Sequence, residues 1–151
     1  MVSAFRIVPP RWVATAMDGE GARLYGGRWN PVGVAVVYLA ESRSLAALEM
    51  LAHLTPQSRR LSFSLIEVRF PESCVGELAQ RELPHNWQDN QAPDSLKRIG
   101  ADWVAGGRSL ALRVPSAVVG GEFNYLLNPA HSDSTKLQLS EPVEWVFDRR
   151  I

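Results

Sequence analysis

A single acidic residue within an apolar helical run is the feature that most restricts how this chain can fold. The run LAALEMLA is apolar at every position except Glu49. Ser42 and Ser44 precede it, and serine is a preferred N-cap, so the pattern predicts a helix over residues 44–54 that Pro56 ends. Residues three and four apart share a helical face, so Glu49 has no clearly solvated face. Because an unpaired buried carboxylate is costly, Glu49 must be paired, protonated or exposed to a cleft, and we favour the cleft.

Length and composition indicate one folded domain that spans residues 1–151. The chain is 46% hydrophobic and 21% charged, which excludes a disordered protein. Sixteen basic and sixteen acidic residues balance, so there is no general basic surface for nucleic acid or an anionic membrane. The single cysteine, Cys74, excludes an internal disulfide and favours a reducing compartment. The longest apolar run, residues 34–40, is too short to span a bilayer and no signal peptide precedes it, so we expect a cytoplasmic protein.

The remaining pattern predicts an α+β fold with a mostly antiparallel or mixed sheet. Asp94 or Ser95 is placed to cap a second helix, which carries Leu96, Ile99, Trp103 and Val104 on one face and has Gly106-Gly107 at its end. Residues 71–93 predict a loop or short helix, and the alternation slips at Ile66, which predicts a bulge. Strands are expected at 5–8, 35–40 (apolar throughout and therefore central), 61–70, 109–114, within 118–128 after a glycine turn, 136–140 and 143–147.

Two candidate binding residues lie just before the predicted central strand and within it. Arg28 stands in the glycine-bounded loop GGRWNP, where a guanidinium and backbone amides can hold a phosphate or carboxylate. The alternative is an exposed arginine stacked on Trp29. Tyr38 lies in the apolar strand, where a tyrosine is most often a core residue with a bonded hydroxyl.

The remaining candidate residues form one site with Glu49 only if the fold brings them together. For Glu49 itself the structural alternative is a buried Glu–Arg pair, and His53, four residues later, is placed to hydrogen-bond it. Ser116 lacks a G-x-S-x-G elbow, which argues against a hydrolase nucleophile. Asn124 follows a glycine turn and suits either a ligand contact or turn closure. The three histidines have no metal-ligand spacing, which predicts no metal site.

Four segments together resemble the RES family: GGRWNPVGVAVVYLAES, SLAALEMLAHL, SLALRVPSAVV and EFNYLLNP. They occur in the family's order and spacing, and the likeness extends from Phe5 to Arg149. The Arg, Glu and Ser that give the family its name fall on Arg28, Glu49 and Ser116, its tyrosines on Tyr25 and Tyr38, and its asparagine on Asn124. RES proteins are toxins of bacterial toxin–antitoxin pairs, and their antitoxins carry an Xre-type helix-turn-helix.

The resemblance implies an ADP-ribosyltransferase-like fold, with a split sheet around a central cleft for NAD. NAD would be the substrate, with no tightly bound cofactor. Glu49 would stabilise the oxocarbenium-like state formed as the nicotinamide–ribose bond breaks. Arg28 would hold the pyrophosphate or fix the phosphate on the nicotinamide side, and Tyr25 or Tyr38 would stack on nicotinamide. Ser116 and Asn124 would hold the nicotinamide amide or ribose hydroxyls.

These expectations describe an NAD-consuming toxin of the glycohydrolase or phosphorylase type. Neither Glu41 nor His53 is a clear acceptor-activating group, which favours water or phosphate as the acceptor. The alternatives are a mono-ADP-ribosyltransferase that modifies a cellular protein and a non-enzymatic nucleotide-binding module. The expected partner is an Xre-type antitoxin that blocks the cleft and presents a carboxylate to Arg28. Nucleic acid would be reached only through that antitoxin, and no membrane contact is expected.

Overall fold

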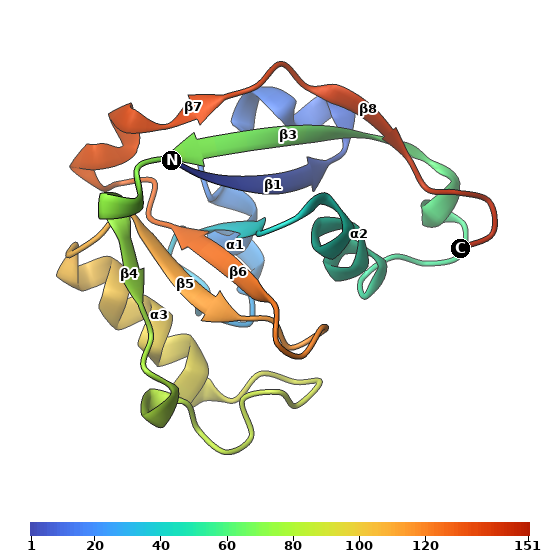
Figure 1. The fold of residues 1–151 in the computed structure, drawn as a ribbon. Coiled ribbons are helices and arrows are strands. Elements are labelled where there is room, and N and C mark those ends of the chain that lie inside the picture. Colours follow the sequence, from blue (N-terminus) through green and yellow to red (C-terminus); the bar gives the residue numbers. More distant parts are fainter.

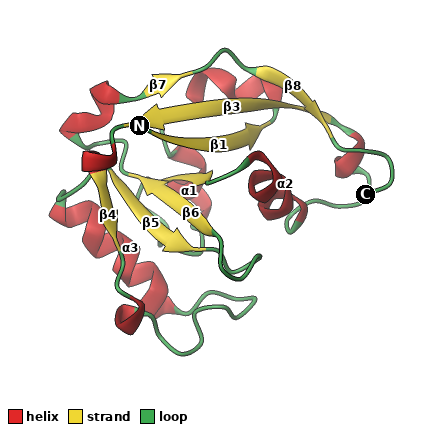
Figure 2. Ribbon diagram, viewed as in Figure 1, coloured by secondary structure: helices red, strands yellow, loops and turns green.

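The computed structural model describes residues 1–151, which form eight strands, three α-helices and five short 3-10 turns (Figures 1 and 2). The helices are α1 (Glu20–Tyr25), α2 (Arg43–Leu51) and α3 (Asp94–Gly106). The strands are β1 (Val2–Val8), β2 (Val37–Ala40), β3 (Ser62–Phe70), β4 (Val75–Glu77), β5 (Ala111–Pro115), β6 (Phe123–Leu127), β7 (Gln138–Leu139) and β8 (Val143–Val146). None of the helices combines the length and apolar character needed to cross a bilayer.

One mixed sheet contains all the strands, in the order β4-β5-β6-β2-β1-β3-β7, with β8 also paired to β3. Every pair is antiparallel except β4 with β5, and α3 makes the crossover between those two strands. The central strands β1 and β2 meet at a single residue pair, Phe5 opposite Ala40. Beyond that pair they diverge, so the sheet is split into two halves that fan apart in Figure 1. The expected α+β class with a split, mixed sheet is therefore confirmed.

The two faces of the sheet are covered by different parts of the chain. One face buries a large apolar cluster that includes Ala4, Val68 and Leu127, with the 3-10 turn of residues 10–15 packed nearby. The opposite face carries α2 and α3. Leu45 of α2 packs in a cluster that contains residues of β1, β2 and β3, and α3 packs its predicted apolar side against β5 and β6. The side of the sheet that carries the helices also holds Glu49 and its partners.

Burial on both faces explains why the alternation slips in β3. Leu65 packs in the cluster beneath α2, whereas Ile66 packs in the cluster on the opposite face. Ser64 to Phe70 pair one-for-one with β1, so the predicted bulge is wrong. Two consecutive apolar residues are the normal pattern where a strand is covered on both sides.

Several predicted boundaries also need correction. α2 ends at Leu51, several residues before Pro56, so the proline does not end the helix. Residues 71–93 contain β4, a three-residue edge strand whose partner is distant in sequence. α1 is a six-residue helix in a region for which the sequence predicted no element. α3 lies where the second helix was predicted, but its N-cap is Pro93, so Asp94 and Ser95 are helical residues and not the cap. The C-cap, Gly107, has a φ of 59°, the left-handed conformation that glycine adopts readily.

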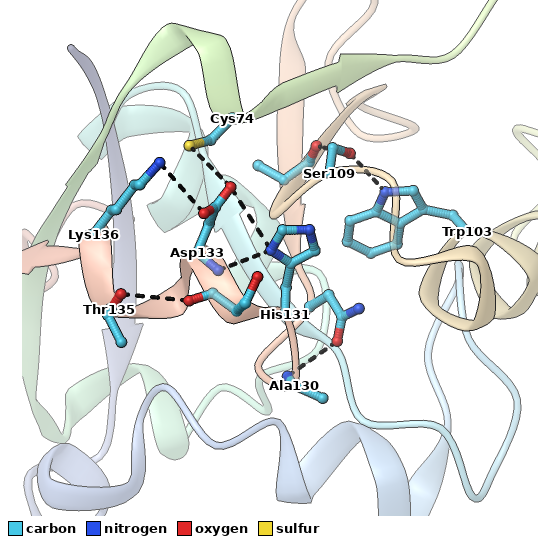
Figure 3. Close-up of polar contacts among 11 residues, drawn as sticks. Cys74, Trp103, Ser109, Ala130, His131, Asp133, Thr135 and Lys136 are labelled. Carbon is cyan, nitrogen blue, oxygen red and sulfur yellow. Dashed lines mark hydrogen bonds and ion pairs between the residues drawn. The ribbon is translucent and has the colours of Figure 1, made fainter.

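A polar cluster fastens the segment after β6 to the turn before β4 (Figure 3). The buried thiol of Cys74 donates to Asp133 Oδ2 at 3.8 Å, and Lys136 Nζ lies 3.3 Å from Asp133 Oδ1. His131 Nδ1 accepts from the backbone N–H of Asp133 at 3.0 Å. These groups satisfy one another, so the cluster stabilises the fold on the side of the sheet away from α2.

Candidate functional site

The carboxylate of Glu49 joins three segments of the chain. Glu49 lies one turn after the fully buried Leu45, so the helix directs it towards the sheet. Its Oε1 accepts a hydrogen bond from Ser116 Oγ at 2.8 Å and from Asn124 Nδ2 at 2.7 Å. Ser116 follows β5 and Asn124 lies in β6. The structure therefore brings these three predicted site residues into direct contact.

Both donors to Glu49 are neutral, which decides between the alternatives for this residue. No lysine or arginine lies within ion-pair distance, so a structural Glu–Arg pair is excluded. His53 is exposed and makes no hydrogen bond to Glu49, so that expectation is wrong. Glu49 Oε2 has no protein partner. The carboxylate keeps one oxygen for a ligand.

Ser116 supports the site by fixing the turn between β5 and β6. Its hydroxyl oxygen accepts from the N–H groups of Val118 and Val119 at 3.1 and 3.0 Å. Its own N–H donates to Glu122 O at 2.8 Å across the turn. With its proton donated to Glu49 and its lone pairs occupied, Ser116 is bonded as an anchor and not as a free nucleophile.

Four buried polar side-chain atoms have no hydrogen-bond partner, and one of them, Asn124 Oδ1, belongs to this group. The other three are Arg6 Nε, Arg59 Nε and Trp145 Nε1. Arg6 lies in β1 opposite Ile66, so it projects to the face of the sheet away from α2, and its Nη1 donates to the backbone oxygen of Tyr38 at 3.0 Å. Burial lowers the pKa of the Arg6 guanidinium from its ordinary value, and the charge of Asp18 opposes that shift. A buried polar atom without a partner is rare in a native protein, so a ligand group is the natural explanation for Asn124 Oδ1, which lies beside Glu49.

The sequence analysis did not predict that the guanidinium of Arg6 is buried. The signal was an arginine inside the apolar strand sequence AFRIV, where a long cation needs a specific acceptor. That signal gives no partner, because Tyr38 is 32 residues away and contributes only a backbone carbonyl.

Tyr38 holds the turn of residues 26–30 in place. Its hydroxyl donates to Asn30 Oδ1 at 2.5 Å and accepts from the N–H of Trp29 at 3.0 Å. Burial raises the pKa of Tyr38 above its ordinary value, so the hydroxyl keeps the proton that it donates. A Cβ at Gly27 would lie 2.6 Å from the Tyr38 hydroxyl oxygen, so only glycine fits there. The interpretation of Tyr38 as a residue with a bonded hydroxyl is confirmed, and its catalytic role stays a prediction.

Arg28 extends from this turn to a distant loop. Its Nη1 donates to Trp87 O at 2.9 Å and its Nη2 to Asn90 O at 3.4 Å. Trp29 is buried in the cluster beneath α3, so it is not the exposed stacking partner that the alternative required. Tyr25 lies at the end of α1 with 84% of its surface exposed, outside both groups of contacts.

The two groups of contacts lie on one face of neighbouring strands. Tyr38 pairs with Leu126, and Ala40 with Asn124, so all four side chains project from the same side of the sheet. Asn124 is two residues from Leu126, which is about 7 Å along a strand. The carboxylate of Glu49 and the turn that carries Arg28 therefore border the same stretch of β2 and β6.

A comparison with known proteins identifies the family: the RES domain profile matches residues 3–148. The chain belongs to the RES family. It is 41% identical over 148 residues to a protein named Toxin Res from Yersinia enterocolitica, covering 97% of each chain. It is 38% identical to the Prs ADP-ribosylating toxin of a Sphingobium species, covering 91% of this chain and 88% of that one. The family predicted from the four sequence segments is confirmed.

A solved structure supports the fold independently. The protein is similar to a chain in the crystal structure of the M. tuberculosis MbcT–MbcA toxin–antitoxin complex, with a TM-score of 0.77. The likeness covers 95% of this chain and 84% of that chain. Because the identity is 19%, this likeness concerns the fold alone.

Proposed function

We propose that this protein is the toxin of a toxin–antitoxin pair and that it cleaves the nicotinamide–ribose bond of NAD. The observation that carries the proposal is the bonding of Glu49. One carboxylate oxygen is held by two neutral donors, Ser116 just after β5 and Asn124 in β6, and the other has no protein partner. The RES relatives from Yersinia and Sphingobium support the assignment through their names.

The chemistry follows from the charge on Glu49. As the bond between ribose C1′ and the nicotinamide nitrogen breaks, nicotinamide leaves as a neutral molecule and positive charge develops on the ribose. A fixed carboxylate stabilises that charge more than it stabilises the bound substrate, which lowers the barrier. The acceptor then bonds to C1′ and releases its proton to solvent. Ser116 and Asn124 keep Glu49 oriented without neutralising it, because neither carries a charge.

The unpartnered oxygen of Asn124 provides a further contact. Asn124 Oδ1 is a hydrogen-bond acceptor and would receive an N–H from the carboxamide or an O–H from a ribose. Tyr38 and Arg28 would border the substrate on the side of the turn.

Two acceptor classes are consistent with this site. We expect a small acceptor, water or phosphate, because the Glu41 carboxylate accepts from the Phe123 N–H and the exposed His53 makes no hydrogen bond to Glu49. A protein acceptor is the second candidate, and the similarity to the Prs ADP-ribosylating toxin of Sphingobium favours it. Both candidates share the same first bond cleavage.

The test is to incubate purified protein with NAD labelled in its adenylate part and to measure nicotinamide release, with and without phosphate. Free ADP-ribose or its 1-phosphate as the only products would support a small acceptor. A discrete labelled protein band in a lysate would support the protein acceptor instead. Absence of nicotinamide release without phosphate, with phosphate and in the lysate would refute the proposal.

An enzyme that consumes NAD must be inhibited in its host, so we propose an antitoxin partner of the Xre type that blocks the site. Its inhibiting segment would present a carboxylate to Arg28, because a guanidinium binds that group through two hydrogen bonds. Expression of the protein alone should deplete NAD and stop growth. Normal growth with abundant soluble protein would contradict the proposal.

A further inference from the structure

Residues 84–93, here called the strap, run beside the turn that carries Arg28. They contain no helix or strand, and their only internal backbone hydrogen bonds are Trp87 N–H to Pro84 O and Asp89 N–H to Asn86 O. Trp87 and Ala92 pack partly against the apolar cluster beneath α3 and fasten the strap at two points. Residues 88–91 between them are all exposed. The tip of the strap therefore has little to hold it except Arg28.

The turn on the other side of this contact is rigid. Trp29 N–H is bonded to the Tyr38 hydroxyl, and Lys97 Nζ donates to Gly27 O at 2.6 Å. α3 passes so close that a Cβ at Gly100 would lie 1.6 Å from Trp29 O. Because the backbone on both sides of Arg28 is fixed, the strap is the partner that can move when the contact breaks.

The bonding of Arg28 is weak for an arginine in this position. Its guanidinium carries a full charge and donates only to two neutral carbonyl oxygens, of Trp87 and Asn90. A diphosphate offers charged acceptors that suit the same fork of N–H groups, and such bonds are roughly twice as strong. Asp89 and Asp94 at the strap carry negative charge, which an arriving diphosphate would repel.

We propose that Arg28 is a latch that holds the strap in the free protein and releases it when the guanidinium binds the diphosphate of the nucleotide. This inference rests on the proposed function, since the diphosphate is that of NAD. Arg28 is then a positioning residue in the free protein and a substrate contact in the complex. Binding of the nucleotide and opening of residues 88–91 are one coupled event.

A spin label at the strap tip tests the latch. Asn90→Cys places the label on an exposed side chain, and the contact with Arg28 is kept because it uses the backbone carbonyl of residue 90. The native Cys74 is buried, and the protein without the substitution provides the labelling blank. The electron paramagnetic resonance line shape gives the ratio of mobile to immobile label. ADP-ribose is the probe, because it carries the diphosphate and is not consumed; nicotinamide, which has no phosphate, is the control.

We expect ADP-ribose to raise the mobile-to-immobile ratio about tenfold or more, since two hydrogen bonds from a charged donor are lost. Arg28→Ala should give the mobile spectrum without ligand. Arg28→Lys should do the same, because a single ammonium lacks the fork that spans two carbonyl oxygens. Nicotinamide should change nothing. Arg98→Ala removes an exposed arginine of α3 that makes no hydrogen bond. It is the matched control and should give the same spectrum as the labelled protein that keeps all its arginines.

An immobile label in Arg28→Ala would overturn the latch. ADP-ribose that binds by calorimetry while the label stays immobile would also overturn it, and nicotinamide release from NAD would show that the proposed function survives. If ADP-ribose does not bind at all, the latch is overturned, and nicotinamide release from NAD again shows whether the proposed function survives.

Discussion

Glu49→Gln separates the charge of the site from its shape. Glutamine keeps Oε1 in place, where it can still accept from Ser116 and Asn124. Its new amide replaces Oε2, which has no protein partner, so no donors are forced together. The two hydrogen bonds change from charge-assisted to neutral, a loss of about 1 kcal/mol each, so the free energy of unfolding should fall by about 2 kcal/mol. The protein should stay folded.

The same change should lower catalysis far more than stability. Removing one preorganised electrostatic group costs about 10²- to 10³-fold in kcat, and Glu49→Gln removes the only charge that is bonded into the group with Ser116 and Asn124. Nicotinamide release at saturating NAD measures this effect, and urea unfolding measures the stability of the same preparation. Glu144→Gln, which removes an exposed acid of β8, is the matched control and should leave both values unchanged.

A folded Glu49→Gln with undiminished turnover would refute the role given to the carboxylate. A Glu49→Gln that unfolds would show that the charge is needed to assemble β5 and β6 and would favour a structural role. Glu49→Ala adds a useful comparison, because it also leaves the Asn124 amide without any partner. Its free energy of unfolding should fall by about 1–3 kcal/mol more than that of Glu49→Gln.

Three further substitutions and one control test the scaffold by urea unfolding. Gly100→Ala should destabilise the protein by about 3 kcal/mol or more, because its Cβ would lie 1.6 Å from Trp29 O. Gly106→Ala in the same helix meets no atom closer than 3.7 Å and should be nearly neutral by comparison. Because the pKa of Tyr38 is raised in the folded protein, its contribution to the free energy of unfolding is fully present below about pH 10, the pKa of a tyrosine in the unfolded chain. That contribution falls as the pH rises above this value. Tyr38→Phe should lose that part of the alkaline dependence and about 1–3 kcal/mol at neutral pH, because two hydrogen-bond partners are left unsatisfied. Ser42→Ala should lower the free energy of unfolding by about 1 kcal/mol, because the Ser42 hydroxyl accepts from the N–H of Leu45 in the first turn of α2. An unchanged urea midpoint would contradict the capping role.

Local patterns predicted the elements that local interactions determine. Ser42 caps α2 as expected, and Leu96 and Trp103 form the buried side of α3. β4 was missed because three residues carry no periodic signal and its partner β5 lies beyond α3. The bulge at Ile66 was wrong because alternation reports burial on one face, and β3 is buried on both.

The site likewise contains one residue that local sequence reveals and others that it does not. Glu49 could be recognised from sequence, because a carboxylate in an apolar helix is anomalous wherever it points. Its donors could be named only through the family resemblance, because Ser116 and Asn124 lie 67 and 75 residues away. The contact of Arg28 with residues 87 and 90 had no sequence signal, because it uses backbone carbonyls that every residue type provides.

Under the proposed function, the distance along the chain between Glu49 and its partners also affects when a newly made protein becomes active. A nascent chain that has reached residue 100 contains Glu49 but neither Ser116 nor Asn124, and β2 still lacks its neighbour β6. At ordinary translation rates the 75 residues from Glu49 to Asn124 take about 4–15 s to synthesise. The carboxylate cannot be oriented during that interval, so no activity is possible before Asn124 has been synthesised. Under the proposed function, an antitoxin made at the same time has those seconds to be ready at the site.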